Sequence, residues 1–130
     1  MKKYRIECTE EQLHMIANCV EDCSRFAAGQ MELWNTTSRC AFGDNYYELH
    51  FKLRELQPLM TPALGRGSSY SWFGGNCPNE PQRKFIAKTY GIYREILHYL
   101  NRDAEGCNVY KSETLTCKDS VPLIKVEEIK

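Results

Sequence analysis

Cysteine and histidine are the most reactive residue types in this chain, because a thiolate is a nucleophile and both side chains bind metal ions. The sequence contains seven cysteines and three histidines. It has no CxxC pair, and His14, His50 and His98 lack the spacing of metal ligands. No local signature places a thiol beside a histidine base. We interpret the cysteines as reduced, small buried hydrophobic residues, with zinc binding as the competing interpretation.

Glycine-rich phosphate loops and paired carboxylates are the other patterns that would indicate an enzyme. The glycines occur as GRG and GG, and neither GxxxxGKS/T nor a GxGxxG that follows a strand is present. Three pairs of adjacent carboxylates fall where a solvated helix face or strand end is expected. These pairs are Glu10 and Glu11, Glu21 and Asp22, and Glu127 and Glu128. We predict a protein that binds its target without catalysis and without a cofactor.

One loop, the segment GRGSSYSWFGGNCPNEP, is rich in glycine, serine and aromatic residues. Two basic residues follow it at the start of the next predicted helix. An aromatic ring that stacks on a nucleotide base contributes about 1–3 kcal/mol. Backbone N–H groups at a helix N-terminus, with Arg83 and Lys84 beside them, attract an anion. The candidate binding residues here are Tyr70, Trp72, Phe73, Asn76, Asn79 and Arg83. This corner suits a nucleotide, although the rings could also simply pack beneath a long loop.

Apolar residues at helical spacing predict three helices that position this loop. Thr9 and Gln12 form a capping-box pattern that predicts a first helix over residues 10–28, ended by Gly29. Its expected buried residues are Leu13, Ile16, Ala17, Val20, Cys23, Phe26 and Ala27. A second helix is expected over about 45–58, capped by Asp44.

The third helix is expected to begin after Asn79, which can cap it, and to end near Asn101. Its broad apolar face consists of Phe85, Ile86, Tyr90, Tyr93, Ile96, Leu97 and Leu100. Gly91 costs about 1 kcal/mol inside a helix, so it indicates a close approach by another backbone, at a helix crossing or a subunit contact.

Residues at both ends of the chain alternate between apolar and polar, which is typical of strands. Strands are expected around Tyr4–Cys8 and in the segments CNVYKS and PLIKVEEI. Residues 31–43 show no sustained period and are expected to form a loop that carries Trp34. The predicted fold is therefore α+β, a single domain of residues 1–130 in which a small antiparallel sheet from the N- and C-terminal strands packs with three helices.

Composition limits the classes of partner. The 17 basic and 17 acidic residues cancel, so no long-range field would hold duplex nucleic acid or an anionic membrane. The N-terminal lysines are not followed by an apolar run, and no stretch of about 18 apolar residues occurs. We expect a chain that is neither exported nor membrane-spanning. Neutrality and the broad apolar face of the third helix favour a homo-oligomer, at least a dimer.

The order of these segments, with SRFAAGQ at the end of the first helix, SY in the loop and AKTYGIYREILH in the third helix, resembles a known family. The chain is similar, over nearly its whole length, to the first type of Thoeris anti-defence protein, a family of small phage proteins. The resemblance implies a protein of the host cytoplasm that sequesters cyclic ADP-ribose-type signals of bacterial TIR-domain enzymes and does not cleave them.

The resemblance also implies an assembly, a hexamer built from dimers. It implies cyclic ADP-ribose pockets at dimer interfaces and separate pockets for cyclic trinucleotides of CBASS at three-fold axes. Arg25, from SRFAAGQ, would face such an axis, although it could also be a solvated charge at a helix end. Thr116 and Lys118 would reach into the pocket of the partner subunit. Arg54 could reach the cleft of the aromatic loop or cover apolar surface with its stem.

Two other classes of function remain open from the residues. A protein–protein adaptor that inhibits a bacterial enzyme would use the aromatic loop as its contact surface. A small DNA-binding regulator would need a helix-turn-helix, but about 20 residues separate the second and third predicted helices where that motif has 3 or 4.

Overall fold

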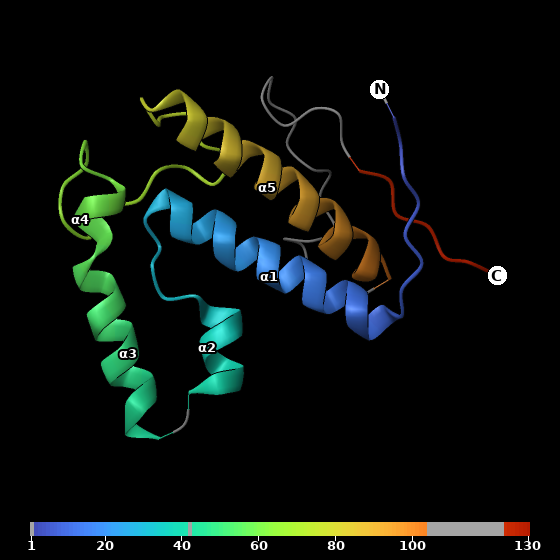
Figure 1. Ribbon diagram of the computed structural model, residues 1–130, viewed down its shortest axis with the longest axis horizontal. Coiled ribbons are helices and arrows are strands. Elements are labelled where there is room, and N and C mark those ends of the chain that lie inside the picture. The colour runs from blue at the N-terminus through green and yellow to red at the C-terminus, as the bar shows by residue number, and fades with distance from the viewer. Residues whose placement is uncertain (1, 42, 104–123) are drawn as a thin grey trace.

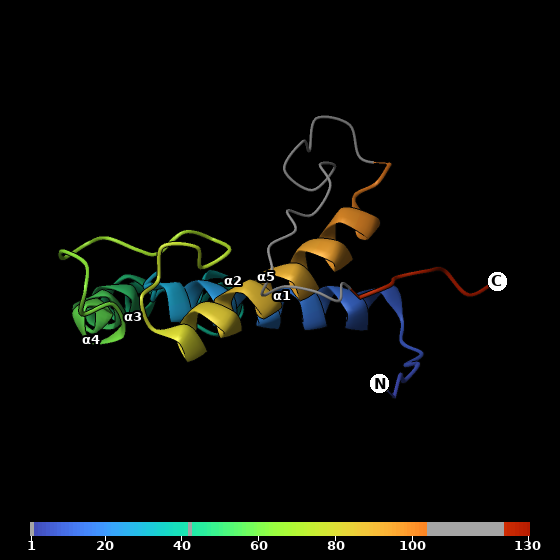
Figure 2. The ribbon, with the colours of Figure 1, turned by 90° about the horizontal axis from the view of Figure 1, so that it is seen from above.

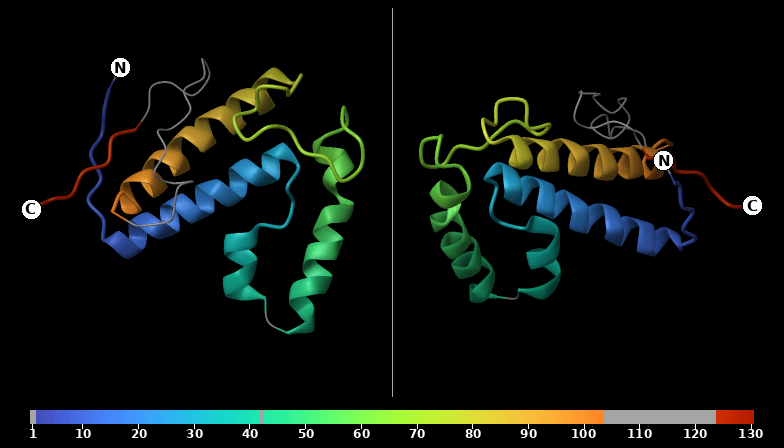
Figure 3. Two further views of the ribbon diagram at one scale, coloured as in Figure 1. Left: turned by 180° about the vertical axis from the view of Figure 1, so that it is seen from behind. Right: turned by 45° about the horizontal axis from the view of Figure 1, so that its top comes forward.

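A computed structural model of the chain describes residues 2–41, 43–103 and 124–130. These residues form five helices: α1 (Glu10–Ala28), α2 (Trp34–Cys40), α3 (Asp44–Glu55), α4 (Gln57–Met60) and α5 (Glu80–Leu100). The two long helices, α1 and α5, lie side by side, while α2 lies on the other side of α1 and α3 stands farther out (Figures 1 and 3). A long loop joins α4 to α5.

Helix α1 begins and ends where its sequence predicts. The Thr9 hydroxyl accepts from the Gln12 amide at 3.1 Å, and the Gln12 side chain accepts from the Thr9 amide at 2.9 Å, which completes the capping box. Gly29 ends the helix in the left-handed region at φ 106°, which favours glycine because a Cβ is strained there. Helix α5 is capped by Asn79, whose side chain accepts from the Gln82 amide at 2.9 Å. The sequence predictions for the bounds of α1 and α5 are therefore confirmed.

The main core lies between α1 and α5. It consists of the buried residues Ala17, Tyr90, Tyr93, Ile96 and Leu97. Gly91 is buried on α5, and its interpretation as a site of close backbone approach stays a prediction. The Ser24 hydroxyl ties the two helices together by donating to the Ile86 carbonyl at 3.3 Å.

Residues 34–40 form helix α2, so the prediction of a loop over 31–43 is wrong. The reason is a cap that comes from another helix. The Asp22 carboxylate on α1 accepts from the amides of Asn35 at 3.1 Å and Thr36 at 2.8 Å, and from the Thr36 hydroxyl at 2.6 Å. It thereby satisfies N–H groups of the first turn of α2, as an N-cap side chain would. The local residue at that position, Leu33, provides no such bond.

Helix α3 begins at Asp44, with Gly43 as its N-cap residue, so Asp44 does not cap the helix as predicted. The predicted single helix over 45–58 is divided, because α3 ends at Glu55 and α4 follows it. An aromatic contact holds α3 to α2. The buried His50 ring lies 4.4 Å from the Trp34 ring and 4.2 Å from the Tyr46 ring, centroid to centroid.

The predicted antiparallel sheet is absent from the described residues, which contain helices and no strand, so the α+β prediction is wrong for them. An isolated extended segment has no neighbour for its backbone hydrogen bonds, and alternation alone cannot supply one. Tyr4 and Ile6 are 85% and 79% exposed. Ile124 and Val126 pack against the α1–α5 core, and the two chain ends point in different directions (Figure 2). The expected strand CNVYKS lies outside the described residues.

Candidate functional site

The loop between α4 and α5 is fixed to the ends of the two long helices. The Tyr70 amide donates to the Ala28 carbonyl at 2.8 Å. The Gln82 side-chain amide donates to the carbonyls of Ala27 at 2.8 Å and Met60 at 2.9 Å, which joins the ends of α1 and α4 to the start of α5. The loop therefore lies over a rigid junction.

Side-chain amides also brace the loop from within. The Gln57 carboxamide accepts from the Gly67 amide at 2.8 Å and donates to the Ser68 carbonyl at 2.9 Å. It also contacts the buried Thr61 hydroxyl. Asn76, a predicted binding residue, accepts from the Ser71 amide at 2.7 Å and hydroxyl at 3.0 Å, so in this structure its carbonyl oxygen holds the turn that carries Trp72.

The three predicted loop aromatics have different environments. Tyr70 is 3% exposed and packs with Ala27, Ala28, Cys77 and Ile86. Phe73 is half-buried against the α1–α5 core. Trp72 is 61% exposed. Only Trp72, of these three, presents a large ring surface to solvent.

Trp72 is exposed but not loosely placed. Its ring stacks on the buried Tyr90 ring, with centroids 6.3 Å apart and planes 17° apart. Tyr90 is held in turn by the edge of the Tyr93 ring at 5.4 Å. One face of the indole is thus supported by the core, and the rest is accessible. We call Trp72 with its support Tyr90 the aromatic ledge.

A cation lies beside this ledge. Burial raises the pKa of the Tyr90 phenol, and the positive charge of Arg94, one turn farther along α5, opposes that rise. Arg94 is itself half-buried on α5. Sequence reasoning did not include Tyr90 or Arg94 among the site residues. Their spacing of four residues on one predicted helix was the available signal.

The expected anion-binding corner at the start of α5 is partly occupied by its own side chains. The Asn79 carbonyl oxygen caps the Gln82 amide, and Lys84 forms an ion pair with Glu80 at 2.7 Å. Arg83 is half-buried, and its backbone carbonyl lies against Gly74, where a Cβ would come within 2.8 Å. Gly74 therefore permits the close approach of loop and helix.

The other predicted arginines lie in networks of their own. The Arg25 guanidinium contacts the Glu21 carboxylate at 3.2 Å and donates to the Gln30 side chain at 2.8 Å. Arg54 pairs with Glu32 at 2.9 Å. Both side chains remain about half exposed, at 43% and 55%. Thr116 and Lys118 lie outside the described residues.

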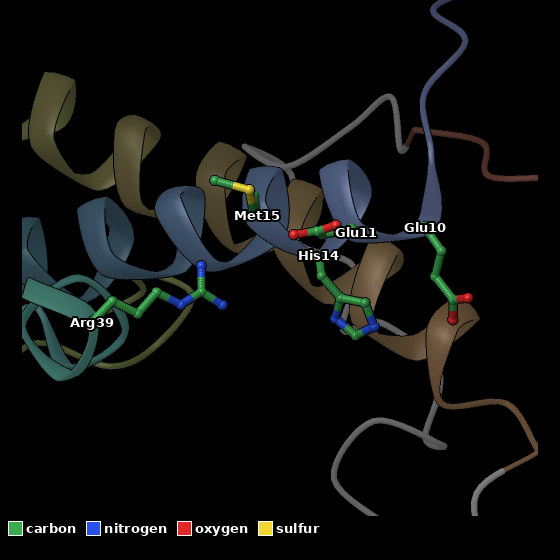
Figure 4. Close-up of a pocket in the computed structure, with 5 residues that line it drawn as sticks. All are labelled: Glu10, Glu11, His14, Met15 and Arg39. Carbon is green, nitrogen blue, oxygen red and sulfur yellow. The ribbon is translucent and has the colours of Figure 1, made fainter.

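A shallow hollow of about 620 Å³ lies at the opposite end of α1 (Figure 4). Its lining residues are Glu10, Glu11, His14, Met15 and Arg39. None of them is a predicted binding residue, and their side chains spread apart in the view of Figure 4. Within the described part of the chain, no group of His, Cys, Asp and Glu side chains could hold a metal ion, and no helix has the length and hydropathy of a membrane span.

The prediction of buried cysteines is wrong for most of those described. Cys77 is buried, but Cys8, Cys19, Cys23 and Cys40 are exposed thiols. Helical periodicity could not show this, because it identifies an apolar face without showing whether anything covers it.

Comparisons of the chain with protein families, with curated proteins and with solved structures gave no match. The interpretation of the site therefore depends on its own geometry.

Proposed function

We propose that this protein is a phage anti-defence protein that sequesters cyclic ADP-ribose-type signals of TIR-domain enzymes in the host cytoplasm and does not cleave them. The observation that supports this most is the aromatic ledge, an exposed indole supported by the core through Tyr90, whose phenol is influenced by the charge of Arg94. The proposal includes a homo-oligomer, with a dimer as its unit and a hexamer as the full assembly, and does not include duplex nucleic acid or a membrane as partner.

The ledge suits the chemistry of such a signal. An adenine ring has a π-face that stacks on an indole, and a pyrophosphate carries charge that a guanidinium binds with two hydrogen bonds. Because Trp72 already stacks on Tyr90, its side chain loses little conformational entropy when a base binds. Arg94 beside Tyr90 would supply the cation. Binding by stacking and ion pairing leaves every bond of the ligand intact.

A second site for cyclic trinucleotides is part of the proposal and involves Arg25. This residue projects from the last turn of α1, and its bonds to Glu21 and Gln30 hold the guanidinium in one orientation. Three such groups around a three-fold axis would match a ligand of the same symmetry. Arg54, Asn79, Arg83, Thr116 and Lys118 remain proposed contacts of the signal.

The second candidate function is a protein–protein adaptor, and the same exposed Trp72 favours it. Tryptophan is among the residue types enriched in interface hot spots. The two candidates differ in what they bind, so one set of variants tests both.

Calorimetry with cyclic ADP-ribose isomers tests the proposal. Trp72→Ala should weaken binding about 10-fold or more, because the stacking contribution is lost, whereas Trp72→Phe should retain most of the affinity. Tyr47→Ala is the matched control, since Tyr47 is a 76% exposed aromatic on α3. Failure of the wild-type protein to bind any isomer would contradict the proposal and favour the adaptor.

A further inference from the structure

The turn that carries Trp72 is closed by backbone and side-chain hydrogen bonds. The Ser71 carbonyl accepts from the Gly74 amide at 2.8 Å, and the Gly74 carbonyl accepts from the Cys77 amide at 3.0 Å. The Asn76 side chain closes this double turn, because its Oδ1 atom accepts from the Ser71 amide at 2.7 Å and from the Ser71 hydroxyl at 3.0 Å. Trp72 follows directly after the residue that Asn76 holds.

The chemistry of these bonds fixes which end of the Asn76 carboxamide faces the turn. A backbone N–H group can only donate, so the atom that meets the Ser71 amide must be the carboxamide oxygen. The two N–H donors of the carboxamide take no part in either bond to Ser71, and the residue is exposed. The turn therefore needs an acceptor at position 76 and does not need a donor there.

The double turn is seated on α5 at two points. Gly74 is buried, and a Cβ there would come within 2.8 Å of the Arg83 carbonyl oxygen. The Trp72 ring stacks on the Tyr90 ring with planes 17° apart. With Gly74 fixed against the helix, the direction in which Trp72 leaves the turn depends on how Ser71 is held. The bonds from Ser71 to Asn76 hold it.

We infer that Asn76 is a positioning residue of the aromatic ledge, which acts on signal binding through the orientation of Trp72 and makes no contact with the signal. The sequence predicts Asn76 as a binding residue, and the geometry assigns it this different role. A contact residue would use its exposed N–H donors, whereas a positioning residue needs only its oxygen. The effect on signal binding rests on the proposed function, and the effect on Trp72 does not.

Two substitutions at Asn76 separate these roles in calorimetry with the cyclic ADP-ribose isomers. Asn76→Asp keeps an oxygen acceptor for Ser71 and removes both N–H donors, whereas Asn76→Ala removes the acceptor as well. At physiological salt, which screens an exposed carboxylate, Asn76→Asp should stay within about 3-fold of the wild-type affinity. Asn76→Ala should weaken binding about 5-fold or more, because a freed indole loses rotamer freedom when a base binds. A contact through the N–H donors would instead make both variants weak.

The mobility of the Trp72 indole gives a readout that needs no ligand. A proton–nitrogen correlation spectrum shows the indole N–H groups of Trp34 and Trp72 separately, and Trp72→Phe assigns them. The heteronuclear NOE of the Trp72 indole, which reports picosecond to nanosecond motion, should fall in Asn76→Ala and keep its wild-type value in Asn76→Asp. The Trp34 indole should not change. Asn45→Ala, at an exposed asparagine of α3, is the matched control and should change neither indole.

A third variant keeps the test valid if Asn76→Ala does not fold, which circular dichroism verifies. Ser71→Ala loses the hydroxyl bond and keeps the amide bond, so its Trp72 indole should be more mobile than in the wild-type protein. A Trp72 indole that stays rigid in the folded variants without these bonds would overturn the inference, as would an Asn76→Asp protein that behaves like Asn76→Ala. A protein that shows the expected indole changes and binds no cyclic ADP-ribose isomer would contradict the proposed function and leave the positioning of Trp72 by Asn76 in place.

Discussion

Trp72 combines two properties that rarely occur together at a protein surface, exposure and a fixed orientation. A free indole on a loop loses rotamer freedom when it binds, and that loss reduces affinity. Stacking on Tyr90, together with the Asn76 brace of its turn, fixes the ring before any ligand arrives. The loop sequence SYSWFGGN contains three aromatic residues with no pattern that separates the exposed one from the two turned inward. Only packing against α1 and α5 makes that distinction.

Tyr70 shows the opposite arrangement, and its titration gives a prediction. Burial raises the pKa of the Tyr70 phenol above its ordinary value near 10, with a further contribution from Cys77. The native state therefore keeps the phenol proton at pH values where the unfolded chain has lost it. Its contribution to stability is complete below about pH 10 and is lost as the pH rises through the folded-state pKa.

Urea unfolding between pH 9 and 11 tests this effect. Tyr70→Phe should make the free energy of unfolding fall less steeply with pH than in the wild-type protein. Tyr47→Phe, at an exposed phenol, should leave the slope unchanged. Equal slopes in all three proteins would show that Tyr70 does not titrate as its burial implies.

At the scale of elements, helices with local signals were predictable and helices with distant partners were not. Helices α1 and α5 have their caps within the neighbouring residues, so their bounds follow from sequence. Helix α2 depends on Asp22, which lies 14 residues before Thr36 and on another helix. The predicted strands failed for a related reason, since a strand exists only with a partner and the sequence does not show whether one is present.

The end of α1 provides a test of how firmly the loop is attached. Gly29 has φ 106°, and a Cβ there would lie 2.7 Å from the Thr61 side chain and 3.2 Å from the Ser68 carbonyl oxygen. Gly29→Ala should therefore lower the free energy of unfolding by about 1–3 kcal/mol, from backbone strain and overpacking. The matched control is Gly65→Ala, where nothing lies within 4 Å. Denaturation midpoints that shift equally in both variants would contradict this account of the junction.

At the scale of the whole molecule, the candidate site joins segments far apart in sequence. The indole comes from a loop, its support and cation come from the middle of α5, and the base of the loop is fixed to the end of α1. The sequence could indicate the loop and a helix start as a binding corner. It could not show that Trp72 lies over Tyr90 instead of near the helix N-terminus, because that depends on how the loop folds back.

The central claim is that the protein holds its signal without changing it. The most direct measurement uses the cyclic ADP-ribose isomer that the protein binds most tightly. The protein is incubated in molar excess over this isomer and is then denatured by heat, and the released nucleotide is quantified by chromatography. The account predicts full recovery of the intact cyclic compound from the wild-type protein, with far less retained before denaturation by Trp72→Ala. Recovery of linear ADP-ribose or smaller hydrolysis products in place of the cyclic compound, or no retention at all by the wild-type protein, would contradict it.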